Sequence, residues 1–301
     1  MNKRISNLEQ IMYARSIILN EGEAKGKNLI DVYNGVLECL ISVDNGLDVT
    51  SLKYKGVNIS YLSKMGINSK LDDFPYRFEG GLLYTCGLDN IGTMNGKFKH
   101  GMYHLKKAIL TKKIVNENEI IIEGEVFDNK FFEQNLKLKR TIKFNYLSSK
   151  FYIEDKVLNI GYEEAKYCLL YHFNLGYPFL DENCEIKFGN ENIVAKTEIA
   201  NKNISRQKMF ETPCDNSIEE VFYCLNNNGL VEVFNKKSKL KFKLKYDSSL
   251  LPIIAQWKSY KSGDYALGLE PSTSKMDNEI VYKTLKPSEK IVYKFEIEIT
   301  E

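Results

Sequence analysis

Apolar and polar residues alternate with a period of two along most of the chain. The alternation is clearest in seven segments, many of them separated by polar or glycine-containing breakers such as VNENE, NNNG, NKKS and DSS. The segments are GVLECLISV, VNISYLS, NLKLKRTIKFNY, KFYIEDKVLNI, GLVEVF, KLKFKLKY and EKIVYKFEIEI. A period of two is typical of strands that bury one face, and no strand–helix–strand rhythm is present. The pattern predicts an all-β protein built from antiparallel strands.

The first twenty residues depart from this pattern. Ser6, followed three residues later by Glu9, forms a capping-box pattern ahead of apolar residues at positions 8, 11 and 12. We expect a short helix from about residue 7 to about residue 19. No Pro/Ser-rich linker, low-complexity tract or internal repeat divides the rest of the chain, and all-β sandwiches of this length commonly form one domain. We therefore predict a single domain over residues 1–301.

Composition supports a large core and argues against some partners. Hydrophobic residues make up 43% and aromatic residues 12% of the chain, which is ample material for packing between sheets. The 42 basic and 40 acidic residues give a formal net charge of +2, so the charge indicates no nucleic-acid or anionic-membrane partner. One segment, KKSKLKFKLKY, interleaves lysines with aromatic residues as a nucleic-acid binder does. We favour a half-buried strand with a solvated lysine face, which also blocks edge-to-edge aggregation. The overall charge is balanced, and no nucleic-acid module is recognisable.

Cysteine usage and apolar runs bear on the compartment. The six cysteines form no CxxC pair, so we expect reduced thiols, most of them in the core. The first twenty residues contain no apolar run sufficient for a signal peptide, and no stretch approaches a membrane span. We expect a cytoplasmic protein. Strand alternation predicts buried faces but not which surface meets a second copy, so the oligomeric state is left open.

Three segments gather the residues that can do chemistry. FPYRFEGGLLYTCGLDNIGTMNGKFKHG, at residues 74–101, combines an arginine, two acids, a histidine and six glycines, as a sugar-handling loop does. In CLLYHFNLGYP, at residues 168–178, strand alternation turns His172 and Asn174 to one face. In QWKSYKSGDYALGLEPST, at residues 256–273, Glu270 precedes a proline, where a carboxylate is costly to bury without a partner or ligand. Taken alone, such a histidine is more often a core residue and such a glutamate a solvated strand end.

The order of these motifs resembles the active-site segments of the aldose 1-epimerase (galactose mutarotase) superfamily. The resemblance is closest to a less characterised bacterial branch, whose members share the GGLLYTCGL core, the downstream HG, the YHFN segment and the GLEP segment in this order. The segments EGEAKGKNLIDV, GLDV and YKGVNISYLS are also similar to that branch. The resemblance implies a galactose-mutarotase-like supersandwich with the sugar in a cleft on one concave sheet. It also implies an isomerase that interconverts sugar anomers and needs no cofactor.

Anomer interconversion requires one acid and one base. The base takes the proton of the C1 hydroxyl while the acid protonates the ring oxygen, and ring closure on the other face reverses the two roles. The resemblance assigns His172 as general acid and Glu270 as general base, with the sugar between them. We expect an ion pair that raises the pKa of His172 and lowers the pKa of Glu270. The resemblance also assigns Arg77 and His100 to sugar binding, and a guanidinium fork suits vicinal hydroxyls.

Four further residues are candidate sugar contacts. Trp257, the only tryptophan, is either a stacking platform for a sugar ring or a core residue. Gln256 lies on the other face of the same strand and can bond a hydroxyl. Asp89 can bind a hydroxyl or close an Asx turn. Asn174 shares the face of His172.

Other catalytic templates are absent from the sequence. There is no HExxH, GxSxG, P-loop or GxGxxG, and three histidines without a cysteine cluster give no zinc pattern. Two alternative functions remain for the implied fold: a sugar-binding protein without turnover, and a lyase acting on an acidic polysaccharide. Arginine occurs only at positions 4, 15, 77, 140 and 206, whereas phosphate recognition favours arginine clamps. A neutral or uronic monosaccharide is therefore favoured over a sugar phosphate.

Overall fold

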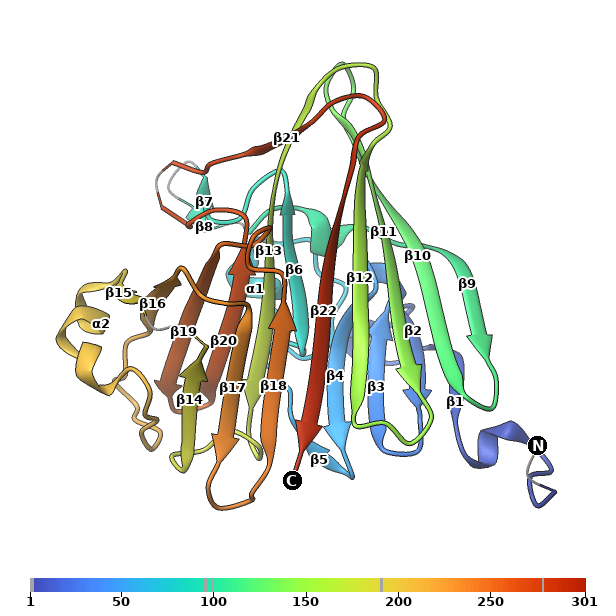
Figure 1. The fold of residues 1–301 in the computed structure, drawn as a ribbon, viewed down its shortest axis with the longest axis horizontal. Helices are drawn as coiled ribbons and strands as arrows, with labels where there is room; N and C mark the ends of the chain where they lie inside the picture. The colour runs from blue at the N-terminus through green and yellow to red at the C-terminus, as the bar shows by residue number, and fades with distance from the viewer. Residues whose placement is uncertain (1–2, 95–96, 99, 190–191, 278) are drawn as a thin grey trace.

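Three large antiparallel sheets make up most of the molecule (Figure 1). The computed structural model describes residues 3–94, 97–98, 100–189, 192–277 and 279–301. The first sheet has five strands in the order β1-β2-β3-β4-β5, which span Tyr13–Ile18, Asn28–Tyr33, Leu37–Ser42, Asp48–Tyr54 and Val57–Asn58. All of its pairings are antiparallel, as the alternating pattern predicts.

The second sheet has the most strands and crosses Figure 1 from β14 on the left to β9 on the right. Its eight strands follow the order β14-β17-β18-β22-β12-β11-β10-β9. They span Cys184–Phe188, Leu230–Asn235, Lys241–Tyr246, Lys290–Thr300, Lys150–Asn159, Asn135–Asn145, Glu119–Asn129 and Ile109–Val115. In β11 every second side chain is buried over the whole strand, which is the burial that its period-two sequence predicts.

The third sheet carries the candidate site. Its path is β15-β16-β19-β20-β13-β21, with β6 paired to β13 beside this path. These strands span Asn192–Ala195, Glu220–Leu225, Ile253–Lys261, Asp264–Ser272, Ala165–Gly176, Lys283–Leu285 and, for β6, Leu83–Leu88. A small two-stranded sheet pairs β7 (Thr93–Met94) with β8 (Lys97–Phe98).

Helices are few and short in the described residues. The α-helices are α1 (Phe74–Arg77) and α2 (Glu198–Lys202). The 3-10 turns are η1 (Leu8–Gln10), η2 (Gly22–Ala24), η3 (Val43–Asn45), η4 (Tyr103–Leu105) and η5 (Ile204–Arg206). None of the helices described is long and apolar enough to cross a membrane.

The expected N-terminal helix is wrong beyond its first turn. Only η1 is helical, and its capping box is formed by Asn7 and Gln10 instead of Ser6 and Glu9. Residues 13–18, which we expected to be helical, form β1 and pair with β2. A capping box satisfies the backbone of one turn only, so it does not determine whether the following residues continue the helix or join a sheet.

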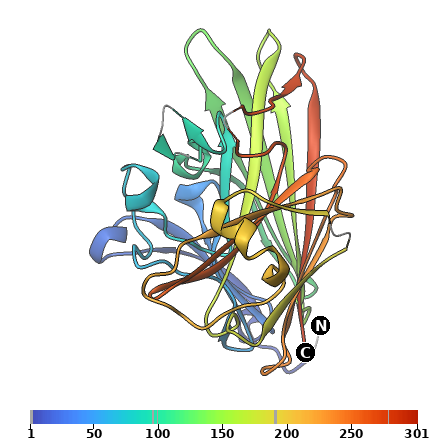
Figure 2. The same cartoon turned by 90° about the vertical axis from the view of Figure 1, so that its left-hand side faces the viewer.

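One large hydrophobic core joins the three sheets. It includes Ile30 and Val49 from the first sheet, Ile142 and Phe295 from the second, and Leu269 from the third. Figure 2 shows the second sheet on one side and the blue strands of the first sheet on the other. Each such side chain contributes about 1.5–3 kcal/mol when it is fully buried. The observed architecture confirms the predicted all-β supersandwich.

The lysines of the KKSKLKFKLKY segment and the cysteines are placed as the sequence predicts, the lysines on a solvated strand face and most cysteines in the core. On β18, Lys243 stands opposite Glu232 and Glu298, so the lysine face is matched by acids on the neighbouring strands. The charge of this face is therefore balanced locally, as expected for a solvated strand. The six cysteines, all within the described residues, form no disulfide, and every one except Cys214 is buried.

Candidate active site

His172 and Glu270 lie side by side on neighbouring strands. β13 pairs with β20 in a register that places Phe173 opposite Leu269, so His172 and Glu270 stand next to that pair. The Nε2 atom of His172 lies 3.2 Å from Oε1 of Glu270, and both side chains are buried. The structure thus brings together the two residues that the sequence analysis assigned as acid and base. They contact each other directly, whereas we expected the sugar to separate them.

The alternation of β13 explains why His172 faces the site. Residues 167–176 are all buried, so both faces of the strand are covered. Tyr171 and Phe173 pack against Phe295 in the main core, with ring centroids 4.4 and 5.4 Å from its centroid. His172 therefore points to the opposite face, where a smaller apolar cluster that includes Leu170 and Tyr223 surrounds the site.

Gly268 supplies the space that the pair occupies. A Cβ atom at this position would lie 2.7 Å from Cε1 of His172 and 2.9 Å from Oε1 of Glu270. Both distances are shorter than a Cβ atom keeps from a carbon or oxygen atom that is not bonded to it. Any side chain here would therefore displace the imidazole or the carboxyl group. The glycine of the GLEP segment is therefore part of the geometry of the site.

Burial sets the protonation of the pair. Desolvation, with a smaller effect of nearby His100, lowers the pKa of His172 well below its ordinary value. Desolvation also raises the pKa of Glu270 to about 8, although the ammonium of Lys196 opposes this shift. At neutral pH the two side chains thus hold one proton between them, on the carboxyl group. The expected directions of both pKa shifts were wrong, because burial outweighs the attraction between the two ions.

Two atoms of the pair are buried without a partner. Within the described part of the chain, Nδ1 of His172 and Oε2 of Glu270 have no hydrogen-bond partner. A buried polar atom without a partner costs about 1–3 kcal/mol, so most native sites satisfy such atoms. A ligand that carries hydroxyl groups would satisfy both.

His100 reaches the same cavity from a strained turn. Its φ angle is 52°, and the following Gly101 has a φ of 74°, with Asn90 O only 2.3 Å from where a Cβ would stand. The Nδ1 atom of His100 donates to the carbonyl oxygen of Ile91 at 3.0 Å. Burial lowers the pKa of His100 to about 3, so the ring is neutral and its Nε2 atom is an acceptor. The ring centroids of His100 and His172 lie 6.0 Å apart.

A partly open cavity of about 150 Å³ is bordered by His100, His172 and Glu270. Aromatic rings form much of its lining. The ring of Phe78 lies 5.7 Å from the imidazole of His172, and the indole of Trp257 also lies 5.7 Å from it. The lining consists of Phe74, Phe78, His100, His172, Lys196, Thr197, Glu219, Val221, Trp257, Glu270 and Met276. Trp257, for which the sequence left two interpretations open, thus borders the cavity.

Two charged residues of the cavity were not identified from the sequence. Lys196, just after β15, is exposed, and its charge acts on both Glu270 and His100. Glu219, just before β16, accepts a hydrogen bond of 2.8 Å from Nε1 of Trp257. No motif marks either residue, because each lies at the end of a short strand and reaches the site only through the pairing of β15 with β16.

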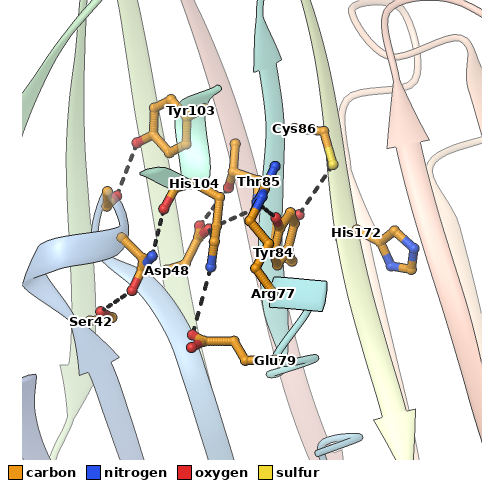
Figure 3. A network of polar contacts seen from close by, with 12 residues as sticks. Ser42, Asp48, Arg77, Glu79, Tyr84, Thr85, Cys86, Tyr103, His104 and His172 are labelled. Atoms are coloured by element: carbon orange, nitrogen blue, oxygen red, sulfur yellow. Dashed lines mark hydrogen bonds and ion pairs between the residues drawn. The ribbon is translucent and has the colours of Figure 1, made fainter. Parts of the chain in front are cut away.

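Arg77 lies behind the cavity, outside its lining. Its guanidinium donates to the hydroxyl of Tyr84, and the ring of Tyr84 stacks on His104 with centroids 3.7 Å apart. Figure 3 shows Arg77 and Tyr84 next to the strand that carries His172. Tyr84 pairs with His172 between β6 and β13, so Arg77 supports the site through this strand pair. The sugar-binding role that the resemblance assigns to Arg77 stays a prediction.

Three other candidates lie outside the cavity lining. Gln256 is fully buried on the far face of β19, where its amide contacts Gln207 at 2.6 and 3.1 Å. Asp89 accepts from the backbone N–H of Met102 at 2.9 Å. Asn174 donates to the carbonyl oxygen of His172 at 3.0 Å, and its side chain acts weakly to raise the pKa of that histidine. These contacts give Gln256, Asp89 and Asn174 structural partners.

A buried charged network stands beside the site (Figure 3). Nδ1 of His104 lies 2.9 Å from Asp48, which also accepts from Arg140 at 2.6 Å. The backbone N–H of Thr85 donates to the same Asp48 carboxylate at 2.8 Å. Because Thr85 follows Tyr84 on β6, the network fixes the strand that pairs with the His172 segment. His104 therefore has a structural role in this network.

The arrangement is suited to proton transfer. A carboxyl group and an imidazole share a proton in a small cavity with aromatic walls, and the neutral imidazole of His100 lies nearby. Among the residues that the structure describes, no group of three or more His, Cys, Asp or Glu side chains could hold a metal ion.

Solved structures share this fold. A proposed aldose 1-epimerase from Klebsiella pneumoniae has a TM-score of 0.86 at 20% identity, over 95% of this chain and 83% of that chain. A galactose mutarotase-like protein from Clostridium acetobutylicum has a TM-score of 0.71 at 19% identity, over 97% and 99% of the two chains. A proposed mutarotase from Salmonella typhimurium has a TM-score of 0.70 at 12% identity, over 99% and 96%.

A protein-family model that matches most of the sequence shows which family the chain belongs to. A comparison with curated proteins finds no match. The model of the family described as Domain of unknown function (DUF4432) matches residues 24–299, which is most of the chain. The chain therefore belongs to the DUF4432 family and has the galactose-mutarotase-like fold.

Proposed function

We propose that this protein is an aldose 1-epimerase-like isomerase that interconverts the anomers of a sugar in the cavity of His172 and Glu270. The observation that carries the proposal is the 3.2 Å contact between these side chains in a cavity of about 150 Å³. Together they hold one proton, so the pair can give a proton and take another without changing its charge.

The proton balance fits ring opening. Glu270, as a carboxylate, takes the proton of the C1 hydroxyl, and His172, as an imidazolium, gives its proton to the ring oxygen. The bond between C1 and the ring oxygen breaks, and the electrons of the O1–H bond form the aldehyde. After rotation about the C1–C2 bond, closure on the other face returns both protons. The two sugar oxygens share one carbon, so a pair in direct contact can reach both of them.

A bound sugar would prepare the pair for this step. The shared proton of the pair lies on Glu270, because burial disfavours the separated charges. Hydroxyl groups of a sugar can donate to Oε2 of Glu270 and stabilise the carboxylate, which moves the proton to His172. The number of protons on the pair stays the same, and only their position changes.

The rest of the cavity suits a sugar ring. Phe78 and Trp257 offer aromatic faces to the apolar C–H patches of the ring. The neutral imidazole of His100, whose Nδ1–H is used by Ile91, also lines the cavity. The proteins of similar fold described as aldose 1-epimerases and mutarotases favour the same reaction class.

Anomeric exchange measured by NMR over a panel of aldoses, uronates and hexose phosphates tests the proposal. We expect wild-type protein to accelerate the exchange of one sugar class, and His172→Ala to lose about 10²- to 10⁴-fold of that rate. Circular dichroism shows whether the variant is folded. Equal exchange rates with and without wild-type protein for every sugar would reject turnover, and sugar binding without turnover would indicate a binding protein.

A further inference from the structure

A groove of about 470 Å³ adjoins the cavity of the candidate site. Phe74, Phe78, Glu219 and Trp257 line both spaces, so the groove and the cavity meet at these side chains. The hydrogen bond from Trp257 to Glu219 holds this junction in place. The groove and the cavity are therefore adjacent, and a molecule that passes these side chains can occupy both.

The groove carries the groups that recognise a second sugar ring. Tyr61 forms one wall with Phe78 and Trp257, and the centroids of these three rings lie 6.4–6.5 Å apart. Such rings stack on the apolar faces of sugars. Opposite charges stand beside them, since Nζ of Lys64 lies 2.7 Å from Oδ2 of Asp264. An ammonium and a carboxylate side by side offer both donors and acceptors to hydroxyl groups.

Charge decides between a neutral and an anionic ligand. The groove lining contains two lysines, Lys64 and Lys261, and two acids, Glu219 and Asp264. These formal charges cancel, so the lining does not favour a phosphate or a carboxylate. The cavity alone is also smaller than the roughly 300–1,000 Å³ of ligand sites that bury most of their ligand.

We infer that the groove is a second sugar subsite, and that the substrate class is a neutral disaccharide or longer oligosaccharide with a free reducing end. This inference rests on the proposed function. The reducing-end ring occupies the cavity, with C1 at His172 and Glu270. The next ring lies in the groove and is joined through a hydroxyl other than that on C1, because C1 must stay free for ring opening.

Two lysines provide a matched test. Lys64 is 59% exposed and paired with Asp264 at 2.7 Å, whereas Lys55 is 54% exposed and paired with Glu301 at 2.8 Å. Only Lys64 lines the groove, so Lys55→Ala controls for the loss of a surface ion pair. Exposed side chains of this kind are removed at little cost to stability.

The KM for anomeric exchange is measured on glucose, galactose, maltose, cellobiose and lactose. For wild type we expect the KM of the best disaccharide to be about tenfold lower than the KM of its reducing-end monosaccharide. One added contact of about 1.4 kcal/mol gives a change of this size. Lys64→Ala should raise the ratio of disaccharide to monosaccharide KM about fivefold to tenfold, as the loss of one typical hydrogen bond does. Lys55→Ala should leave the ratio unchanged. Equal KM values for both sugar classes in wild type, or equal ratios in all three proteins, would overturn the inference.

Trp257 fluorescence separates this inference from the proposed function. As the only tryptophan it lies at the junction, so its emission reports sugar binding even without turnover. If no sugar is exchanged, the proposed function fails. Tighter binding of a disaccharide than of its monosaccharide, weakened by Lys64→Ala, would still support the groove. Equal dissociation constants, or no binding of either sugar, would reject it.

Discussion

Gly268 is a residue whose only contribution is the absence of a side chain. A methyl group there would lie 2.7 Å from Cε1 of His172 and 2.9 Å from Oε1 of Glu270. We predict that Gly268→Ala keeps the fold but lowers the exchange rate about 100-fold, which is the cost of a displacement of about 1 Å in a catalytic group. Gly161→Ala is the control. It lies in the turn after β12, where a Cβ would come no closer than 3.2 Å to a neighbouring atom, and it should keep the wild-type exchange rate. A fully active Gly268→Ala would show that the pair does not need its observed geometry.

The shared proton predicts the pH dependence of turnover. Burial raises the pKa of Glu270 to about 8, so above this pH the pair has lost its proton and no donor remains for the ring oxygen. The value of kcat/KM should therefore fall as pH rises through about 8. On the acid side a second proton binds only well below the ordinary range of histidine, because burial lowers the pKa of His172. A pH–rate profile that instead rises steadily between pH 7 and 9 would contradict this assignment.

Site residues were predictable only where a motif carried them. His172 and Glu270 lie in recognisable segments, and the strand register then places them together. Strand alternation also put Gln256 on the face opposite Trp257, but it could not show that Gln207 already occupies its amide. The protonation of the pair could not be predicted either, because it depends on burial by distant segments.

At the scale of elements, Arg140 ties strands of separate sheets together. It is fully buried on β11 and donates to Asp48 of β4 at 2.6 Å, to Asp155 of β12 at 2.7 Å and to Thr85 of β6 at 2.9 Å. The network thus connects the first and second sheets to the strand beside His172. Its two carboxylates would be left buried without a cation if the arginine were removed.

We predict that Arg140→Met lowers the free energy of unfolding by about 3–5 kcal/mol, measured by denaturant unfolding. Lys139→Ala on the same strand removes a half-exposed ion pair with Glu123 and should cost less than about 1 kcal/mol. Similar losses in the two variants would mean that the buried network does not hold the sheets together.

Strands were easier to predict than the start of the chain. The period-two pattern of β11 and β12 matches alternating burial residue by residue, because each strand has one face in the core. At the N-terminus, the helix signal near Asn7 was real but covered one turn, and pairing with β2 decided the fate of residues 13–18. Local signals set where this first turn begins, whereas tertiary pairing determines that the next residues form a strand.

At the scale of the whole molecule, one core cluster contains residues of all three large sheets. No sheet can therefore lose its packing without exposing the inner faces of the others. We predict a single unfolding transition for residues 1–301, with the same midpoint by far-ultraviolet circular dichroism and by Trp257 fluorescence. Circular dichroism reports every sheet, whereas Trp257 reports the third sheet. Two separated midpoints would show that the chain contains two independent folding units.

The exchange rate of Glu270→Gln tests the central claim most directly. The variant keeps the size and hydrogen-bonding capacity of the side chain but cannot take a proton. Anomeric exchange of the best sugar is measured by NMR on wild type and variant, with binding checked by Trp257 fluorescence. The account predicts retained sugar binding and a loss of about 100-fold or more in rate. Equal rates in the two proteins would contradict it.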